Sequence, residues 1–304
     1  MSDTAPTPID PNGSTAVVTG GASGIGRAIA SELLARGARV VVADVEAPAL
    51  DRTVGELSEL ADGTDRVIGV RTDVTDEADV GALADRTWDW GGGCDLLFLN
   101  AGVTSGGGGL PWQQEPNDWR WCFGVNVFGV GIGVSEFVPR MLESDTPSQV
   151  VVTSSKDGGI APVATASVYA ASKAAASCFT EALQLNLERS GSTVRASVFY
   201  PSGGLMETGL YSAARNRPEH LQRRGEGTGR TGTTFDELVD RVTRATGRAP
   251  RIADLAELAR MAVDGACERR FVIAADLDAT AELLHERADV IGRGEVPPAH
   301  PIGL

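Results

Sequence analysis

The chain has 304 residues and 42% of them are hydrophobic, which suffices for a sizeable core and excludes a disordered or fibrous protein. Acidic residues outnumber basic ones 41 to 27, so the net charge of −14 argues against nucleic acid or an anionic membrane as partner. No apolar run reaches the ~20 residues of a membrane span, and residues 1–14 lack the features of a secretory signal. We therefore expect a cytoplasmic protein with a small-molecule partner, no metal site, and four cysteines that are reduced packing thiols.

Apolar, β-branched runs alternate with segments of helical spacing along most of the chain. Strands are predicted over residues 15–19, 39–43, 67–70, 96–99, 150–153, 194–199 and 270–274, with helices that include 25–36, 49–61, 252–268 and 278–291. The strands are nearly continuous in Val, Leu and Phe, as in a parallel sheet buried on both faces. Repeated β-α units predict an α/β fold: a doubly wound, Rossmann-like parallel sheet with helices on both faces and a ligand site outside the carboxyl ends of its strands.

One domain is predicted, because no linker is long enough to separate two. Residues 1–14 are expected to form a mobile tail, residues 15–292 the folded domain and residues 293–304 a C-terminal tail. The β-α alternation breaks between residues 205 and 250. Within that stretch, residues 223–234 are rich in Gly and Arg and are predicted to be mobile.

Glycines cluster directly after the first predicted strand, in residues 19–26 (TGGASGIG). Between a strand and a helix, glycines allow a tight turn and let backbone N–H groups reach a diphosphate at the helix N-terminus. This pattern predicts a dinucleotide cofactor that contacts Gly20, Ser23, Gly24, Ile25 and Gly26.

Asp44 ends the second predicted strand, where a carboxylate can accept hydrogen bonds from the hydroxyls of the adenosine ribose. The same carboxylate would repel a 2′-phosphate, and the glycine turn contains no Arg or Lys to attract one. The sequence therefore favours NAD(H) over NADP(H). The alternative is that Asp44 only caps the strand.

Tyr169 and Lys173 lie four residues apart at the start of an Ala-rich predicted helix, so their side chains share a face. A phenol with a pKa near ~10 is a poor base at neutral pH, but a neighbouring ammonium and the charge of an oxidised nicotinamide favour the phenolate. The fifth strand ends at Ser155, whose hydroxyl can donate to a substrate oxygen. Asn100 and Asn126 follow apolar segments that face the same crevice, although each alone can be a capping residue.

In this order, these residues resemble the short-chain dehydrogenase/reductase family, and the likeness covers residues 15–290. The family's TGxxxGxG motif matches residues 19–26, its NNAG motif matches residues 99–102 with Leu99 in place of the first Asn, and its YxxxK motif matches Tyr169 and Lys173. The resemblance implies catalytic roles for Asn126, Ser155, Tyr169 and Lys173, and cofactor contacts at Asp73, Val74, Asn100, Ala101, Gly102, Tyr169, Lys173, Pro201, Gly203 and Thr208. Ser154 remains an alternative to Ser155, because the family's gap from serine to tyrosine is one residue shorter. The loop from Pro201 to Thr208 is also longer than the family's.

The resemblance implies an NAD-dependent oxidoreductase that interconverts a secondary alcohol and a ketone. Tyr169 takes the hydroxyl proton, Ser155 steadies the carbonyl oxygen, Lys173 lowers the pKa of the tyrosine and binds the ribose, and Asn126 holds a water that links Lys173 to solvent. In the family, the segment that corresponds to residues 205–250 covers the substrate. Its apolar side chains favour an apolar or aromatic alcohol, with Trp112, Trp119 and Trp121 as further candidate walls.

Two further expectations concern assembly and alternative functions. The small residues of the helix after Tyr169 predict a homodimer or homotetramer, because the family buries this helix between subunits. Residues 223–234 are expected to act as a lid edge that orders on ligand binding, with a plain surface loop as the alternative. The competing functions are a non-catalytic NAD(H)-binding regulator, or an epimerase or dehydratase on the same scaffold.

Overall fold

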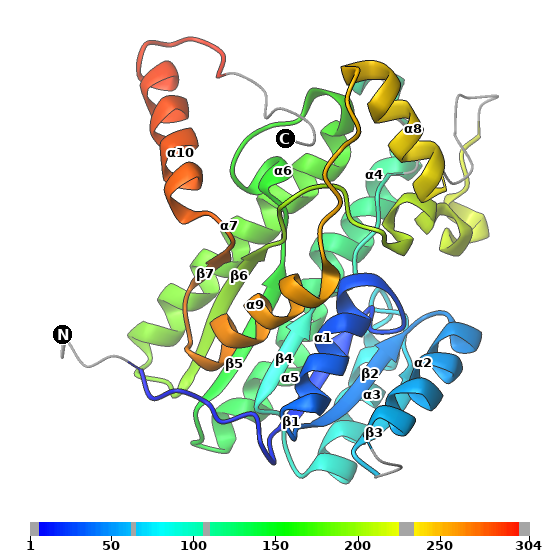
Figure 1. The fold of residues 1–304 in the computed structure, drawn as a ribbon. Helices are drawn as coiled ribbons and strands as arrows, with labels where there is room; N and C mark the ends of the chain where they lie inside the picture. The colour runs from blue at the N-terminus through cyan, green and yellow to red at the C-terminus, as the bar shows by residue number, and fades with distance from the viewer. Residues whose placement is uncertain (1–5, 62–64, 106–109, 225–233, 298–304) are drawn as a thin grey trace.

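The fold is described by a computed structural model that covers residues 6–61, 65–105, 110–224 and 234–297 (Figure 1). Seven parallel strands form one sheet in the order β3-β2-β1-β4-β5-β6-β7. Their bounds are β1 (Thr15–Thr19), β2 (Arg39–Asp44), β3 (Val67–Arg71), β4 (Leu96–Leu99), β5 (Ser148–Thr153), β6 (Val194–Tyr200) and β7 (Val272–Ala274). The predicted doubly wound parallel sheet is thus confirmed.

Helices cover both faces of the sheet, as predicted (Figure 1). On one face lie α1 (Gly24–Ala35), α2 (Ala47–Leu60) and α9 (Leu255–Cys267); on the other lie α3 (Glu77–Gly91), α5 (Gly129–Glu143) and α7 (Ser167–Arg189). The remaining helices are α4 (Pro116–Phe123), α6 (Lys156–Gly159), α8 (Phe235–Thr246) and α10 (Leu277–Gly292). Figure 1 shows α8 and α10 standing beyond the carboxyl edge of the strands rather than on a sheet face.

The alternation of side chains along each strand explains the two layers. Neighbouring strand residues point to opposite faces, and here both faces are apolar. On β1, Val18 packs in one cluster with Ile29 of α1, whereas Val17 packs in another with Phe137 of α5. All four side chains are fully buried, so each strand is fixed in register by apolar contacts on two sides.

The N-terminal segment differs from the mobile tail that the sequence predicts. Within residues 6–14, Ile9 is buried in the core beside α9, and its N–H donates to the carbonyl of Cys267 at 2.8 Å. Ser14 is also buried and donates its hydroxyl to Pro11. A single apolar residue among polar ones gives no periodic signal, so the sequence could not show that this segment docks.

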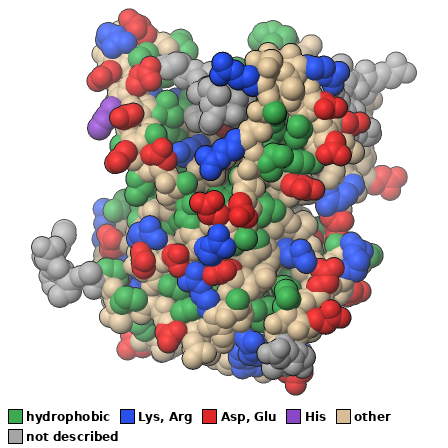
Figure 2. Space-filling model, in the orientation of Figure 1, with side chains coloured by type: hydrophobic (Ala, Val, Ile, Leu, Met, Phe, Trp, Pro, Cys, Tyr) green, Lys and Arg blue, Asp and Glu red, His purple; other side chains and the backbone are tan. Residues whose placement is uncertain are grey.

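The cysteines and the surface charges follow the composition. Cys94, Cys122 and Cys267 are buried thiols, as expected for packing residues, whereas Cys178 is exposed. Acidic and basic side chains are interspersed over the face shown in Figure 2. Among the residues that the structure describes, no group of three His, Cys, Asp or Glu side chains is placed to hold a metal ion.

The sequence expectation of no membrane-length apolar run needs a correction. The π-helical turn η2 (Gly124–Phe128) joins α4 to α5, and the resulting helix, Pro116–Glu143, is long and apolar enough to cross a membrane by length and composition alone. In its most apolar window, 50% of the residues are buried inside the protein. Packing against the sheet, for example by Phe137 and Met141, accounts for this apolar content.

Candidate active site

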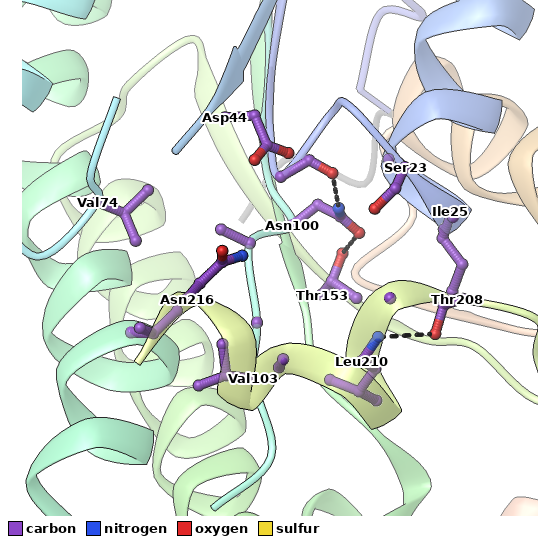
Figure 3. A pocket seen from close by; sticks show the side chains of 18 of the residues that line it. Ser23, Ile25, Asp44, Val74, Asn100, Val103, Thr153, Thr208, Leu210 and Asn216 are labelled. Carbon is purple, nitrogen blue, oxygen red and sulfur yellow. Dashed lines mark hydrogen bonds between the residues drawn. The ribbon is translucent and has the colours of Figure 1, made fainter. Parts of the chain in front are cut away.

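A pocket lies at the carboxyl edge of the sheet and spans the β1–β4 junction, where the strand order reverses (Figure 3). Open parallel sheets bind ligands at this position. The predicted residues that line it are Gly20, Ser23, Gly24, Ile25, Gly26, Asp44, Asp73, Val74, Asn100, Ala101, Gly102, Ser154, Ser155, Tyr169, Lys173, Pro201 and Thr208. The structure brings these residues together from six strand ends. Gly203 and Asn126 are not part of the lining.

The turn after β1 is shaped so that only glycine fits. Gly20 and Gly24 have φ angles of +63° and +55°, in the left-handed region. A Cβ on Gly26 would lie 2.2 Å from the carbonyl oxygen of Gly20, and one on Gly24 would lie 3.0 Å from Thr208. The turn therefore leaves backbone N–H groups accessible at the start of α1, which fits the diphosphate of a dinucleotide.

Asp44 braces this turn and also faces the pocket. Its two carboxylate oxygens accept from the N–H of Ala22 at 3.0 Å and from the N–H of Glu46 at 3.1 Å. Each oxygen keeps a second lone pair for a ligand hydroxyl. Burial raises the pKa of Asp44, and the backbone hydrogen bonds oppose that rise. The side chain can thus hold a ribose and fix the turn at once.

Asn100 ties three strand ends together. Its Nδ2 donates to the carbonyl of Thr19 at 3.1 Å. Its Oδ1 accepts from the Thr153 hydroxyl at 3.2 Å (Figure 3). The side chain therefore holds β1, β4 and β5 at the pocket floor. Asp73 is similarly occupied, because its carboxylate accepts from the N–H and hydroxyl of Thr75. Both residues line the pocket while their side chains support its walls.

Tyr169, Ser155 and Lys173 meet at the other end of the pocket from Asp44. Burial raises the pKa of Tyr169, a polar interaction with the Ser155 hydroxyl opposes the rise, and the negative charge of Asp157 adds to it. Desolvation of the phenol therefore raises the pKa of Tyr169 within the chain itself. The lowering that the sequence predicts also counts the positive charge of an oxidised nicotinamide, and it stays a prediction.

Lys173 is buried, with 3% of its surface exposed, and among the described residues no carboxylate forms an ion pair with its ammonium. Its Nζ donates to the carbonyl of Thr153 at 2.8 Å and lies 5.8 Å from the centre of the Tyr169 ring. Burial lowers the pKa of Lys173 to about 8. A Cβ on Gly102 would come within 3.3 Å of Nζ, so this glycine leaves room beside the ammonium.

Asn126 lies in the π-helical turn η2, just behind Lys173. Its Nδ2 donates to the carbonyl of Val103 and to the Ser172 hydroxyl, both at 2.9 Å, and its Oδ1 accepts from the N–H of Val103 at 2.9 Å. The amide N–H groups are fully used, so a water can bind only to an acceptor oxygen of Asn126. Single π-turns often occur at functional sites.

The two neighbouring serines at the end of β5 point to different partners. Ser154 is 1% exposed, and its hydroxyl bonds the carbonyl of Lys173 at 2.9 Å and the hydroxyl of Ser177 at 2.8 Å. Ser155 is more exposed, caps α6 by accepting from the N–H of Asp157, and interacts with Tyr169. The geometry thus favours Ser155 as the hydroxyl that meets a substrate.

Residues 205–217 cross over the pocket, and both ends of this crossing segment are fixed. At its start, Leu205 exchanges backbone hydrogen bonds of 2.8 Å with Arg251 and Ala253. At its end, Arg217 forms a buried ion pair with Asp118 of α4, with 2.8 Å between Nη1 and Oδ1. Between these points runs the short helix η4 (Gly209–Asn216). Of the predicted lid edge 223–234, residues 225–233 lie outside the described residues.

Part of the pocket lining forms an apolar wall. It consists of Val103, Trp121, Val125, Met206, Leu210, Tyr211 and Ala213. Trp121 therefore forms a pocket wall, as the sequence suggests. Trp112 and Trp119 are 79% and 40% exposed, respectively, so they neither line the pocket nor pack in the core.

The polar lining residues that the sequence interpretation missed include Glu46, Arg215 and Asn216. The Arg215 guanidinium forms an ion pair with the Glu46 carboxylate, and Asn216 donates to the same carboxylate at 2.8 Å. Glu46 lies only two residues after Asp44, which is the one local signal that could have found it. Arg215 comes from η4 and gives no local signal.

Known proteins that resemble this chain share one family. A sequence profile described as short chain dehydrogenase matches residues 14–218. A relative from Streptomyces avermitilis, named 1-deoxy-11-beta-hydroxypentalenate dehydrogenase, is 39% identical over 238 residues, which cover 77% of this chain and 81% of the relative. A short chain dehydrogenase/reductase from Burkholderia phymatum, solved in complex with NAD, superposes with a TM-score of 0.83 and 36% identity, covering 97% of this chain and 100% of that chain.

A metagenomic short-chain oxidoreductase solved in complex with NADP has a TM-score of 0.58 and 28% identity, with coverage of 64% of this chain and 85% of that chain. Nicotinamide cofactors of both kinds thus occur among proteins of this fold. The profile spans more than half of the chain, and the sheet order, glycine turn and YxxxK motif agree with it. The chain therefore belongs to the short-chain dehydrogenase/reductase family, whose members are oxidoreductases that act on hydroxyl groups with a nicotinamide cofactor.

Proposed function

We propose that this enzyme is an NAD-dependent dehydrogenase that interconverts a secondary alcohol and a ketone. The observation that carries the proposal is one continuous pocket with Asp44 and the glycine turn at one end and Tyr169, Ser155 and Lys173 at the other. The first end fits an adenosine diphosphate moiety. The second end offers a phenol, a hydroxyl and an ammonium, which suit proton transfer to or from a carbinol.

The proposed mechanism uses each of these side chains at a stated atom. When bound, the nicotinamide ring supplies the hydride acceptor or donor. During oxidation the Tyr169 phenolate takes the proton of the substrate hydroxyl, and during reduction the phenol returns it. Ser155 donates a hydrogen bond to the same substrate oxygen. The Lys173 ammonium holds ribose hydroxyls and favours the phenolate, and an acceptor oxygen of Asn126 holds a water that passes the proton toward solvent.

The charge of an oxidised cofactor is proposed to add to that of Lys173 in activating the phenol. Burial raises the pKa of Tyr169, and Lys173 is itself destabilised as a cation because burial lowers its pKa to about 8. An oxidised nicotinamide carries a positive charge, which favours the phenolate and opposes this desolvation. Tyr169 is therefore expected to be a stronger base with the oxidised cofactor in place.

The serine assignment leads to a direct comparison of two variants. Ser155→Ala is expected to lower kcat by about 10²-fold, because the hydroxyl that stabilises the reacting oxygen is removed. Ser154→Ala removes only bonds to Lys173 and Ser177 and should lower kcat much less. Steady-state kinetics of both variants, with folding checked by circular dichroism, test this. A larger loss in Ser154→Ala than in Ser155→Ala would reverse the assignment.

The proposed preference for NAD(H) rests on Asp44. We expect NADH to bind at least about tenfold more tightly than NADPH, because the carboxylate accepts ribose hydroxyls and repels a 2′-phosphate. Asp44→Asn keeps an acceptor oxygen but removes the charge. It should therefore reduce the difference in affinity between NADH and NADPH, mainly by strengthening NADPH binding. Titration calorimetry with both cofactors measures the effect. Equal affinities in the unaltered enzyme would contradict the proposal.

The substrate class is proposed from the apolar wall. Val125, Met206, Leu210 and Tyr211 present carbon surface in the pocket that Tyr169 and Ser155 also line. An apolar or aromatic secondary alcohol buries its carbon skeleton there while its hydroxyl reaches the polar end. The relative from Streptomyces avermitilis is named for a hydroxylated pentalenate, which is consistent with an alicyclic alcohol.

A spectrophotometric screen tests the function as a whole. The enzyme is mixed with NAD⁺ and a panel of apolar and aromatic secondary alcohols, and NADH formation is followed, with NADP⁺ in parallel. Reduction of NAD⁺ by at least one such alcohol is expected. Tight NADH binding without turnover of any alcohol, or of any ketone in the reverse direction, would instead indicate a regulator.

We also propose that the enzyme is a cytoplasmic homodimer or homotetramer. Phe128 of η2 and Phe179 and Leu185 of α7 are exposed apolar side chains. Together with small residues such as Ala174 on α7, they offer a surface on which a second copy can pack.

A further inference from the structure

An ion pair joins the two walls of the pocket near its adenosine end. Arg215 of η4 and Glu46, which follows β2, are 169 positions apart in the sequence. The guanidinium contacts the carboxylate through two nitrogens, Nη2 to Oε1 and Nε to Oε2, the latter at 3.2 Å. Burial raises the pKa of Glu46, but the hydrogen bonds from Arg215 and Asn216 outweigh it and hold the pKa below its ordinary value.

The Arg215 guanidinium also faces the phosphate turn. Its Nη1 donates to the carbonyl of Gly209 at 3.0 Å and to the Ser212 hydroxyl at 2.8 Å. A Cβ on Gly209 would lie 3.0 Å from Nη2 of Arg215 and 3.4 Å from the hydroxyl oxygen of Ser23. Gly209 is thus close to both the Arg215 guanidinium and Ser23 of the turn proposed to hold the diphosphate, and the guanidinium is paired with Glu46 after β2.

This cation stands where a cofactor phosphate would be recognised. Among the described residues that line the pocket, the cationic side chains are Arg215 and Lys173, and Lys173 lies at the Tyr169 end. A guanidinium binds phosphate through two parallel hydrogen bonds and is well suited to a 2′-phosphate. An unpaired Arg215 would thus favour NADP(H), against the effect of Asp44.

Glu46 removes that attraction by occupying the guanidinium. The ion pair is partly exposed, with 39% of Arg215 and 27% of Glu46 accessible, and such pairs contribute little to folding stability. The pair has a larger effect on the binding of an anion than on folding stability. The Glu46 carboxylate neutralises the guanidinium, and it adds a second negative group beside that of Asp44. The nearby Arg52 of α2 also acts on Glu46, but it is exposed and not part of the lining.

We propose that Glu46 is a second determinant of the preference for NAD(H), and that it acts by holding Arg215 away from a 2′-phosphate. This inference rests on the proposed nicotinamide cofactor and adds a pair of specificity residues to it. Asp44 rejects the 2′-phosphate directly, whereas Glu46 withholds the cation that would otherwise accept it.

Direct binding measurements on three variants test the proposal. Glu46→Gln keeps the size and an acceptor oxygen but frees the charge of Arg215, so the affinity for NADPH is expected to rise about tenfold or more while that for NADH changes little. Arg215→Gln is expected to weaken NADPH binding, because it leaves the charge of the Glu46 carboxylate without its partner in the pocket. The double variant should lose the gain of Glu46→Gln. Asp85→Asn, which removes the surface pair with Arg140 on α3 and α5, is the matched control and should change neither affinity.

Each outcome separates the inference from the proposed function. Unchanged NADPH affinity in Glu46→Gln overturns the role of Glu46. A gain that persists in the double variant overturns the role of Arg215, because it leaves only repulsion by the carboxylate. Failure of the unaltered enzyme to bind either cofactor contradicts the proposed function itself. Fluorescence titration and calorimetry give these affinities without any substrate.

Discussion

Tyr169→Phe is expected to lower kcat by about 10²- to 10⁴-fold, the usual contribution of a positioned general acid or base. NADH binding should stay nearly unchanged, because only the phenolic oxygen is removed and the ring beside Lys173 remains. The kinetic readout is kcat in both directions, together with a fluorescence titration of NADH. Retention of more than about a tenth of the turnover would contradict a proton-transfer role for this residue.

The pocket supplies a matched control for this variant. Tyr211 also lines it, and burial raises the pKa of its phenol too. Tyr211→Phe should therefore change turnover only slightly, since its hydroxyl is not proposed to transfer a proton. The pH profile separates the two further: because burial raises the pKa of Tyr169, oxidation should accelerate as the pH rises, and only Tyr169→Phe should lose that dependence.

Lys173→Met is expected to abolish activity and yet stabilise the folded protein at neutral pH. Burial lowers the pKa of Lys173 from an ordinary value of 10.5 to about 8. Below that folded-state pKa, the lysine is charged in both states, so the folded protein bears the full cost of a buried ammonium. Between about 8 and 10.5, the folded state loses the proton while the unfolded state keeps it, so stability rises with pH through this window.

The size of this effect sets the measurement. The lowered pKa corresponds to roughly 3 kcal/mol of disfavoured charge, and loss of the bond to the Thr153 carbonyl returns about 1 kcal/mol, so a net gain of ~2 kcal/mol is expected near pH 7. Denaturant unfolding at pH 7 and at pH 9.5 should show a gain that shrinks at the higher pH. Lys156→Met, at the other lysine of the chain, is the control and should show no such gain. If Lys173→Met is less stable than the unaltered protein at pH 7, the buried ammonium does not destabilise the folded state.

Local patterns in the sequence were enough to predict much of the fold and part of the candidate site. The alternation of apolar strands with helices indicated the parallel sheet, because buried strands need apolar residues on both faces. The glycine turn, Asp44, Tyr169 and Lys173 follow strand or helix boundaries that can be recognised in the sequence. Their positions in the pocket then follow from the meeting of all carboxyl strand ends at one edge.

What the sequence could not show depends on contacts between distant segments. Glu46 and Arg215 look like two surface charges until η4 is folded over the pocket. The direction of the Tyr169 pKa depends on how deeply the phenol is buried, which no spacing encodes. The sequence alone gives no reason to prefer Ser155 over Ser154 as the catalytic serine. The structure distinguishes them because the Ser154 hydroxyl is bound to α7.

The segment that crosses the pocket, residues 205–217, is fixed at both ends. Backbone hydrogen bonds of Leu205 hold its start, and the buried ion pair of Arg217 with Asp118 holds its end. Removal of one partner of such a buried pair costs about 3–5 kcal/mol of stability. A segment held at both ends can move outward at its middle, but it cannot rotate away from the pocket about a single hinge. We therefore expect ligands to enter between this segment and the sheet. The length of chain between the two fixed ends should then set an upper limit on the width of the molecules that the enzyme accepts.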